Sequence, residues 1–188
     1  MKPTTLGLAV VAVALASAPA RAAPIPIDGI AAVVDDVILY RSEVLARMRH
    51  HDAQLAMDPD KRKTELAELY RVFVRRMVDE TLIEKDAKRL AIAVTEAEVE
   101  TGVLAVAAQN KVTREQLENQ IARTGFTTAS YRAEIRRQLL EGKWIVQRSV
   151  GKIDRAKASD PAAFEVALEK QRASVLAELR MRAFLEIR

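Results

Sequence analysis

The sequence predicts a mainly α-helical domain of about six helices, with a small β-hairpin near the N-terminus that pairs with a C-terminal strand. Thr95 and Thr113 are each followed three residues later by Glu or Gln, and these capping boxes mark helix starts. Two short β-prone runs flank Asp35 and Asp36, which is the pattern of a hairpin. The tail, residues 182–188, partly alternates between polar and apolar side chains and is the candidate third strand.

The first 22 residues have the three parts of a secretory signal peptide. Lys2 supplies a positive charge, residues 6–16 form an uncharged apolar run, and Ala20 and Ala22 have the spacing of a cleavage site. We expect cleavage after Ala22, with cleavage after Ala20 as the alternative. A membrane anchor is the competing interpretation, but the apolar run is about half of the roughly 20 residues that a spanning helix needs. Residues 23–188 would then form a single domain without stable membrane insertion.

The hairpin is predicted from residues 30–34 and 37–40, which are rich in β-branched side chains. Asp tolerates the positive φ of a two-residue turn better than most residues do, so the two intervening aspartates are acceptable there. Because an isolated hairpin is marginal in water, it needs a further strand or a covering helix. Ser42 is a plausible N-cap for a first helix that runs to about Ala56.

A long second helix is predicted after the Asp-Pro-Asp break at residues 58–60. From Leu66 to Met77, apolar side chains recur at i, i+3, i+4, i+7 and i+11, which places them on one stripe. We expect this helix to end near Leu90. The capping box at Thr95 opens the third helix.

The fourth and fifth helices are predicted from their caps. The helix that Thr113 opens should stop at Gly125, because glycine readily takes the left-handed conformation that follows many helices. Thr127 or Thr128 caps the next helix, which should run to about Val150.

The last helix is predicted to follow a short polar connection, residues 151–160. Asp160 is an N-cap type and Pro161 occupies the first helical position, where a missing N–H costs nothing.

The charge balance argues against a nucleic-acid partner. The chain has 30 basic and 26 acidic side chains, but Lys2 and Arg21 lie in the predicted signal peptide, so residues 23–188 carry 28 basic against 26 acidic side chains. A phosphate-binding surface needs an uncompensated basic stripe. The basic clusters instead lie among acids, as on a solvated helix face; they are residues 61–63, 75–76 and 136–137.

The sequence has no pattern typical of a catalytic or metal site. It contains no cysteine, which excludes thiolate ligands and thiol nucleophiles. His50 and His51 are neighbours, and adjacent helical side chains point about 100° apart, so the two imidazoles do not converge on one metal. No serine lies in a G-x-S-x-G turn, and no glycine pattern matches a phosphate-binding loop. We therefore expect no enzyme, no cofactor and no metal.

The predicted hairpin and first helix have the sequence IAAVVDDVILYRSEVLARM (30–48), and the predicted long helix has the sequence LAELYRVFVRRMVDETLIEKDAKRL (66–90). These segments resemble the opening hairpin, first helix and long helix of the SurA-type periplasmic chaperones. QNKVTREQLENQIARTGFTTASYRAEIRRQLL (109–140) matches most closely, with its Thr-capped helix, Gly turn and Tyr-Arg pair. FLEIR (184–188) resembles the closing strand. The resemblance covers nearly all of residues 28–188.

The resemblance implies a peptide-binding chaperone module in the periplasm. The family usually inserts one or two parvulin-type prolyl isomerase domains before the closing helix, and residues 151–160 are too short to contain one. The implied function is a holdase that binds unfolded or nascent envelope proteins, in particular outer-membrane polypeptides, in an apolar crevice. Because the chain has no nucleotide motif, such binding would be independent of ATP.

Candidate crevice-lining residues follow from residue type, since Met adapts to varied partners and aromatic side chains offer broad faces. For each of them the competing interpretation is an ordinary core residue. The candidates are Met48, Leu55, Met57, Tyr70, Met77, Phe126 and Trp144.

An alternative function is a non-catalytic assembly subunit with one fixed partner in the envelope. The short connection at residues 151–160 would also permit the closing helix to dock on a second copy, which would give an exchanged homodimer.

Overall fold

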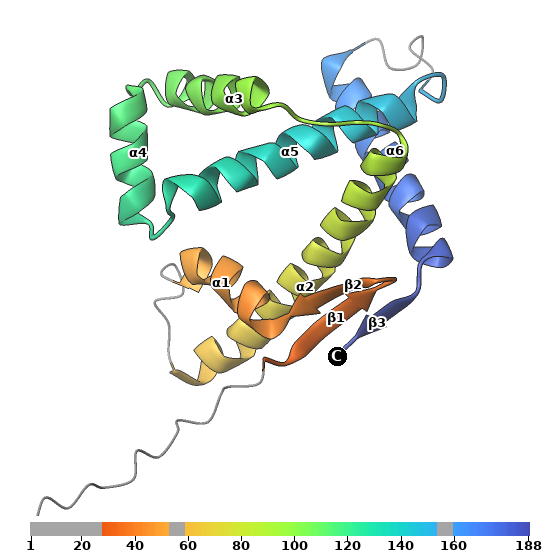
Figure 1. The fold of residues 1–188 in the computed structure, drawn as a ribbon, viewed down its shortest axis with the longest axis horizontal. Helices are drawn as coiled ribbons and strands as arrows, with labels where there is room; N and C mark the ends of the chain where they lie inside the picture. Colours follow the sequence, from red (N-terminus) through yellow and green to blue (C-terminus); the bar gives the residue numbers. More distant parts are fainter. Residues whose placement is uncertain (1–27, 53–58, 154–159) are drawn as a thin grey trace, which may run out of the picture.

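The structure is a computed structural model, and it describes residues 28–52, 59–153 and 160–188. Within these residues the chain forms six helices and one three-stranded sheet (Figure 1). The predicted fold class is therefore confirmed: the protein is mainly helical, and its hairpin pairs with a strand from the C-terminus. The predicted signal peptide, residues 1–22, lies outside the described residues.

The sheet joins both ends of the described chain. It contains β1 (Ile30–Val34), β2 (Val37–Tyr40) and β3 (Leu185–Ile187) in the order β2-β1-β3, and both pairings are antiparallel. Ala32 lies between Leu39 and Ile187 in this register. Strand β1 is central because both neighbours bond to it, so neither the hairpin nor the C-terminal strand is left alone.

Asp35 connects the hairpin turn to the rest of the fold. Its φ of 54° is the left-handed conformation that the two-residue turn requires. Its backbone N–H donates to the carbonyl of Phe184, and its carboxylate accepts from the Phe184 N–H, both at 2.8 Å. Lys85 donates to the same carboxylate at 2.9 Å and lowers the pKa of Asp35 together with the Phe184 N–H. Asp35 therefore links the hairpin turn to the start of β3 through Phe184 and to the long helix through Lys85.

The first two helices pack against the sheet. Helix α1 (Arg41–Asp52) begins two residues before the Glu43 start that an N-cap at Ser42 implies, so the prediction of Ser42 as its N-cap was wrong. The Glu43 carboxylate instead accepts from the Tyr40 N–H at 2.8 Å, and Ser42 donates to Asp28. Helix α2 (Pro59–Arg89) ends one residue before the predicted Leu90.

The next two helices have the predicted capping boxes. Thr95 precedes α3 (Glu96–Gln109) and Thr113 precedes α4 (Arg114–Arg123); each threonine accepts from the backbone N–H three residues on, and that residue's side chain accepts from the threonine N–H. Gly125 follows α4 with φ 84°, as expected.

Helix α5 (Thr128–Ser149) is capped by Thr127, which decides between the two predicted caps. Helix α6 (Pro161–Arg182) follows the predicted cap, with the Asp160 carboxylate accepting from the N–H groups of Ala162 and Ala163. Residues 154–159 of the predicted connection lie outside the described residues.

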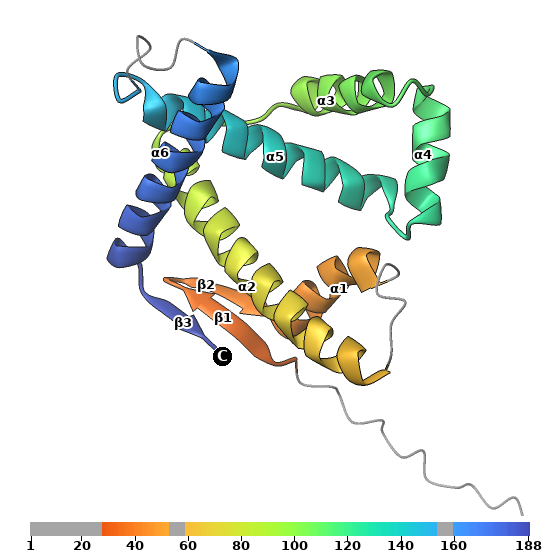
Figure 2. The same cartoon turned by 180° about the vertical axis from the view of Figure 1, so that it is seen from behind.

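Three hydrophobic clusters hold these elements. The first lies between the sheet, α1 and α2, the second at the junction of α2, α5 and α6, and the third among α3, α4 and α5. Figures 1 and 2 show α3, α4 and α5 as three sides of an open frame, with the sheet and α1 at the opposite end of α2. Within this frame, Lys143 of α5 links α5 to α3: it pairs with Glu98 at 2.5 Å and, with the Thr95 N–H, lowers the pKa of Glu98 to about 2.

Candidate functional site

Five of the seven candidate crevice residues lie within the described chain, and three of them, Met48, Tyr70 and Met77, meet in the first hydrophobic cluster. Met48 and Met77 are 5% and 8% exposed, and the half-buried Tyr70 packs against them from α2. Trp144 is 0% exposed in the second cluster, and Phe126 lies half-buried before α5. The competing interpretation, an ordinary core residue, fits Met48, Met77 and Trp144. The other two candidates, Leu55 and Met57, lie outside the described residues.

Trp144 has a structural role that its residue type alone did not reveal. Its indole N–H donates to Asp86 at 2.8 Å, and Arg148 and Arg89 donate to the same carboxylate at 2.7 and 2.5 Å. The Asp86 side chain is only 2% exposed. Burial alone would raise the pKa of Asp86, but these three donors outweigh burial and hold it below its usual value. Trp144 and Arg148 are four residues apart, so the sequence alone places both on one face of the helix, from which they can reach the same carboxylate.

Phe126 and Tyr131 form an edge-to-face pair at the corner between α4 and α5, with ring centroids 6.4 Å apart. Burial raises the pKa of the Tyr131 hydroxyl. The hollow beside Tyr131 has a volume of only about 10 Å³, which is the smallest space that holds one water. This corner is therefore packed, and it has no room for a side chain of a bound peptide.

A larger hollow of about 460 Å³ lies between α2, α5 and α6. Two ion pairs border it: Arg180 binds Asp79 through two donors at 2.6 and 2.9 Å, and Arg172 binds Glu141 at 2.5 Å. The apolar crevice expected from the sequence therefore differs from this hollow, which is mainly charged. Its lining is Val72, Arg75, Arg76, Asp79, Glu80, Glu141 and Arg172.

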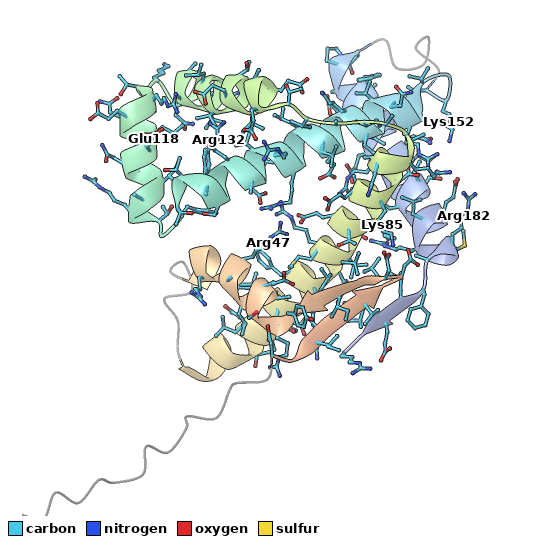
Figure 3. The ribbon with its side chains drawn as sticks, viewed as in Figure 1. Arg47, Lys85, Glu118, Arg132, Lys152 and Arg182 are labelled. Carbon is cyan, nitrogen blue, oxygen red and sulfur yellow. The ribbon has the colours of Figure 1, made fainter. Side chains whose placement is uncertain are left out.

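A network of charged side chains joins α1, α2 and α5. Glu80 accepts from Arg47 of α1 and, at 2.9 Å, from Arg76 of its own helix (Figure 3 labels Arg47). Arg76 also donates to Glu134 of α5 at 3.0 Å, and Arg137 donates to Glu134 at 2.5 Å. Burial would raise the pKa of Glu134, but its arginine partners lower it. This network links α5 to α2 and, through Arg47, α2 to α1.

Exposed apolar side chains are distributed over the surface. On α5 and its C-cap, the uncharged residues Gln138, Gly142, Val146 and Val150 recur every four positions and are all exposed, and we call this line the α5 stripe. Val146 is 58% exposed, and Val150, the C-cap residue, is 71% exposed. Residues 138 and 150 are twelve helical rises apart, about 18 Å, which suits a short peptide segment.

A second group of exposed apolar side chains lies at the end of the chain. Met181 at the end of α6, Phe184 after it and Ile187 in β3 are 80%, 62% and 56% exposed. Because successive side chains of a strand point to opposite faces, Phe184 and Ile187 lie on opposite faces of the sheet. Ile187 lies in β3, at the edge of the sheet where no described strand follows.

Among the described residues, no group of three or more His, Cys, Asp or Glu side chains could hold a metal ion. None of the described helices is long and apolar enough to cross a membrane.

The structure is therefore a mainly helical module with several apolar side chains exposed on its surface. Residues 27–144 match the sequence model of the SurA N-terminal domain. The chain belongs to the SurA N-terminal domain family.

Similar proteins that are named Chaperone SurA support membership in this family. The chain is 28% identical over 131 residues to Chaperone SurA of Pectobacterium atrosepticum, covering 70% of this chain and 30% of the relative. It is 30% identical over 125 residues to Chaperone SurA of Photorhabdus laumondii, covering 64% and 28%, and 28% identical over 113 residues to that of Cupriavidus pinatubonensis, covering 60% and 22%. The match spans less than a third of these relatives. At the level of the family, this supports a chaperone function.

Proposed function

We propose that this chain is an ATP-independent periplasmic holdase that binds unfolded outer-membrane polypeptides. Membership in the SurA N-terminal domain family is the observation that supports it most, because the named relatives are chaperones. The signal-peptide pattern at residues 1–22 supports export to the periplasm. The lack of a nucleotide-binding motif in the sequence supports release without ATP hydrolysis. We also propose that the chain is not an enzyme, since the family match is to the N-terminal domain.

The α5 stripe is the proposed client-binding surface, in place of a deep crevice. Val146 and Val150 are exposed, uncharged and four residues apart, so one apolar side of a client segment can cover both. Gly142 has no atom within 4 Å of the position that a Cβ would take, so the surface beside it is open to a client.

The expected affinity follows from the size of this surface. Burying each valine contributes about 1.5–3 kcal/mol before the entropic cost of ordering the client. Micromolar binding needs about 8 kcal/mol net, so a client must also contact surface beyond the two valines. Glu141 lines the charged hollow and precedes Gly142 in α5, and neighbouring helical side chains point about 100° apart, so a client that contacts both must turn around the helix. The guanidinium and carboxylate groups of the hollow can bond to the polar backbone of an extended client. Weak and sequence-tolerant binding is the result.

The experiment that tests the holdase is light scattering of a denatured outer-membrane barrel protein diluted into buffer. We expect a stoichiometric amount of the purified chain to suppress aggregation without ATP. An inert protein of similar mass at the same concentration is the control. Unchanged scattering would rule out the holdase. Co-purification with a single partner in a fixed ratio, together with unchanged scattering, would instead favour the assembly subunit.

A further inference from the structure

Strand β3 leaves an open edge on the sheet. The Asp35 N–H bonds to the carbonyl of Phe184 at 2.8 Å, and the Arg188 N–H bonds to the carbonyl of Ala31 at 3.0 Å. In an antiparallel strand the direction of bonding alternates from residue to residue. The N–H and C=O groups of Leu185 and Ile187 therefore point away from β1, and no described strand pairs with them.

Within the described residues, this edge is protected only by the shortness of β3 and by the charge of Glu186. Very short strands and charged side chains limit pairing at an edge, as do proline, a bulge or a covering element. Strand β3 contains three residues, Leu185, Glu186 and Ile187, and the irregular pairing of this sheet lies between β1 and β2. Ile187 is 56% exposed. A strand that neutralises the charge of Glu186 can therefore pair with this edge.

We propose that two copies of this chain associate through their β3 strands, antiparallel and centred on Ile187. The two-fold symmetry of an antiparallel pair makes the strand its own partner. With Ile187 opposite Ile187 of the second copy, the two residues exchange both backbone hydrogen bonds through their outward N–H and C=O groups. The result is a continuous six-stranded sheet, in the order β2-β1-β3 followed by its reverse.

Charge complementarity selects this register. Glu186 and Arg188 lie on the same face of the strand, two residues apart, and their side chains pair at 2.7 Å. Centring on Ile187 puts Glu186 directly opposite Arg188 of the second copy, and symmetry repeats the pair. Centring on Glu186 would instead put two like charges opposite each other, which is destabilising. The four charges alternate in sign only when Ile187 is at the centre.

The test is sedimentation velocity of the purified chain over a concentration series. We expect the mass to rise from one chain to two with concentration. Glu186→Arg and Arg188→Glu, made singly, each put like charges opposite and should weaken the dimer at least about tenfold, a loss of about 1.4 kcal/mol. The double variant restores opposite charges and should recover the wild-type dissociation constant. Ile187→Lys should leave only monomer.

The control is Val166→Lys, which adds the same charge at an exposed position of α6 and should leave the dimer unchanged. The substituted side chains are all at least 43% exposed, and thermal melts establish that each variant is folded. A wild type that stays monomeric throughout the series would overturn the proposal. So would a double variant as weak as the single ones, or a dimer that persists in Ile187→Lys, as an exchanged dimer would. If wild type is monomeric and Ile187→Lys weakens peptide binding, the edge belongs to clients instead.

Discussion

Asp86 shows how a single carboxylate stabilises the junction of the longest helices. It lies on α2 and accepts hydrogen bonds from Trp144 and Arg148 on α5. A buried charge without partners is costly, so this residue is stabilising only while its donors remain. Its neighbours Ile83 and Ala87 belong to the same core as Trp144, so the polar and apolar contacts of the junction depend on each other.

Asp86→Asn should therefore destabilise the protein strongly. The amide cannot balance the charge of Arg148 and Arg89, and we expect a loss of about 2–4 kcal/mol in the free energy of unfolding. Urea denaturation at pH 7 measures it. The matched control is Asp36→Asn, the same substitution at a side chain that is 84% exposed, which should change the midpoint little. Equal effects at both positions would contradict the assigned role of Asp86.

The lowered pKa of Asp86 makes the free energy of unfolding depend on pH. The pKa of Asp86 is lower in the folded chain than its ordinary value of 3.8, so the unfolded state binds its proton first as the pH falls. Its contribution is present above about pH 4 and is lost as the pH falls through the lowered pKa. The difference in stability between wild type and Asp86→Asn should therefore shrink below pH 4 in the same denaturation experiment.

At the scale of elements, the helix starts follow local chemistry. A threonine that accepts from the N–H three residues on defines the starts of α3, α4 and α5, and the stripe from Leu66 to Met77 predicts α2. Helix α1 is the exception. Its first turn is fixed by Glu43, which accepts from Tyr40, while Ser42 donates to Asp28, a residue 14 positions earlier. That contact exists only after the hairpin has folded.

Substitution by alanine is expected to have opposite effects on stability at two glycines, one before the start of α5 and one inside it. Gly125 has φ 84°, where a Cβ costs about 1–2 kcal/mol, so Gly125→Ala should lower the free energy of unfolding by about 1 kcal/mol. Gly142 lies inside α5 with open space around its Cβ position, so Gly142→Ala should raise it by about 0.5–1 kcal/mol. Urea denaturation of the two variants measures both effects, and a change of the same sign would contradict the assignment.

At the scale of the whole molecule, the proposed client surface differs from the cores. The buried candidates Met48, Met77 and Trp144 belong to the cores, whereas Val146 and Val150 of the α5 stripe are 58% and 71% exposed. Binding can therefore be separated from stability by choosing residues on the stripe.

The double variant Val146→Glu/Val150→Glu should suppress aggregation of a barrel protein at least about tenfold less efficiently than wild type, because two charges would have to be buried against an apolar client segment. The matched control is Val166→Glu on α6, since Val166 and Val150 are both 71% exposed. Light scattering over a titration of each variant measures the effect. If the control loses as much as the double variant, the client surface is not the α5 stripe.

The sequence alone determined the fold class, the hairpin turn, the third strand and the caps of α3 to α6, because each depends on local pattern or on the chemistry of a few adjacent residues. It did not determine the start of α1, which depends on a contact with Asp28. Only the tertiary structure decided which apolar residues are buried. Met48 and Val146 are both apolar and both lie on helices, but the first faces the sheet and the second faces solvent. Burial depends on which faces meet when distant segments pack, as when α5 lies on α2 through Trp144 and Asp86. Residue type does not contain that information.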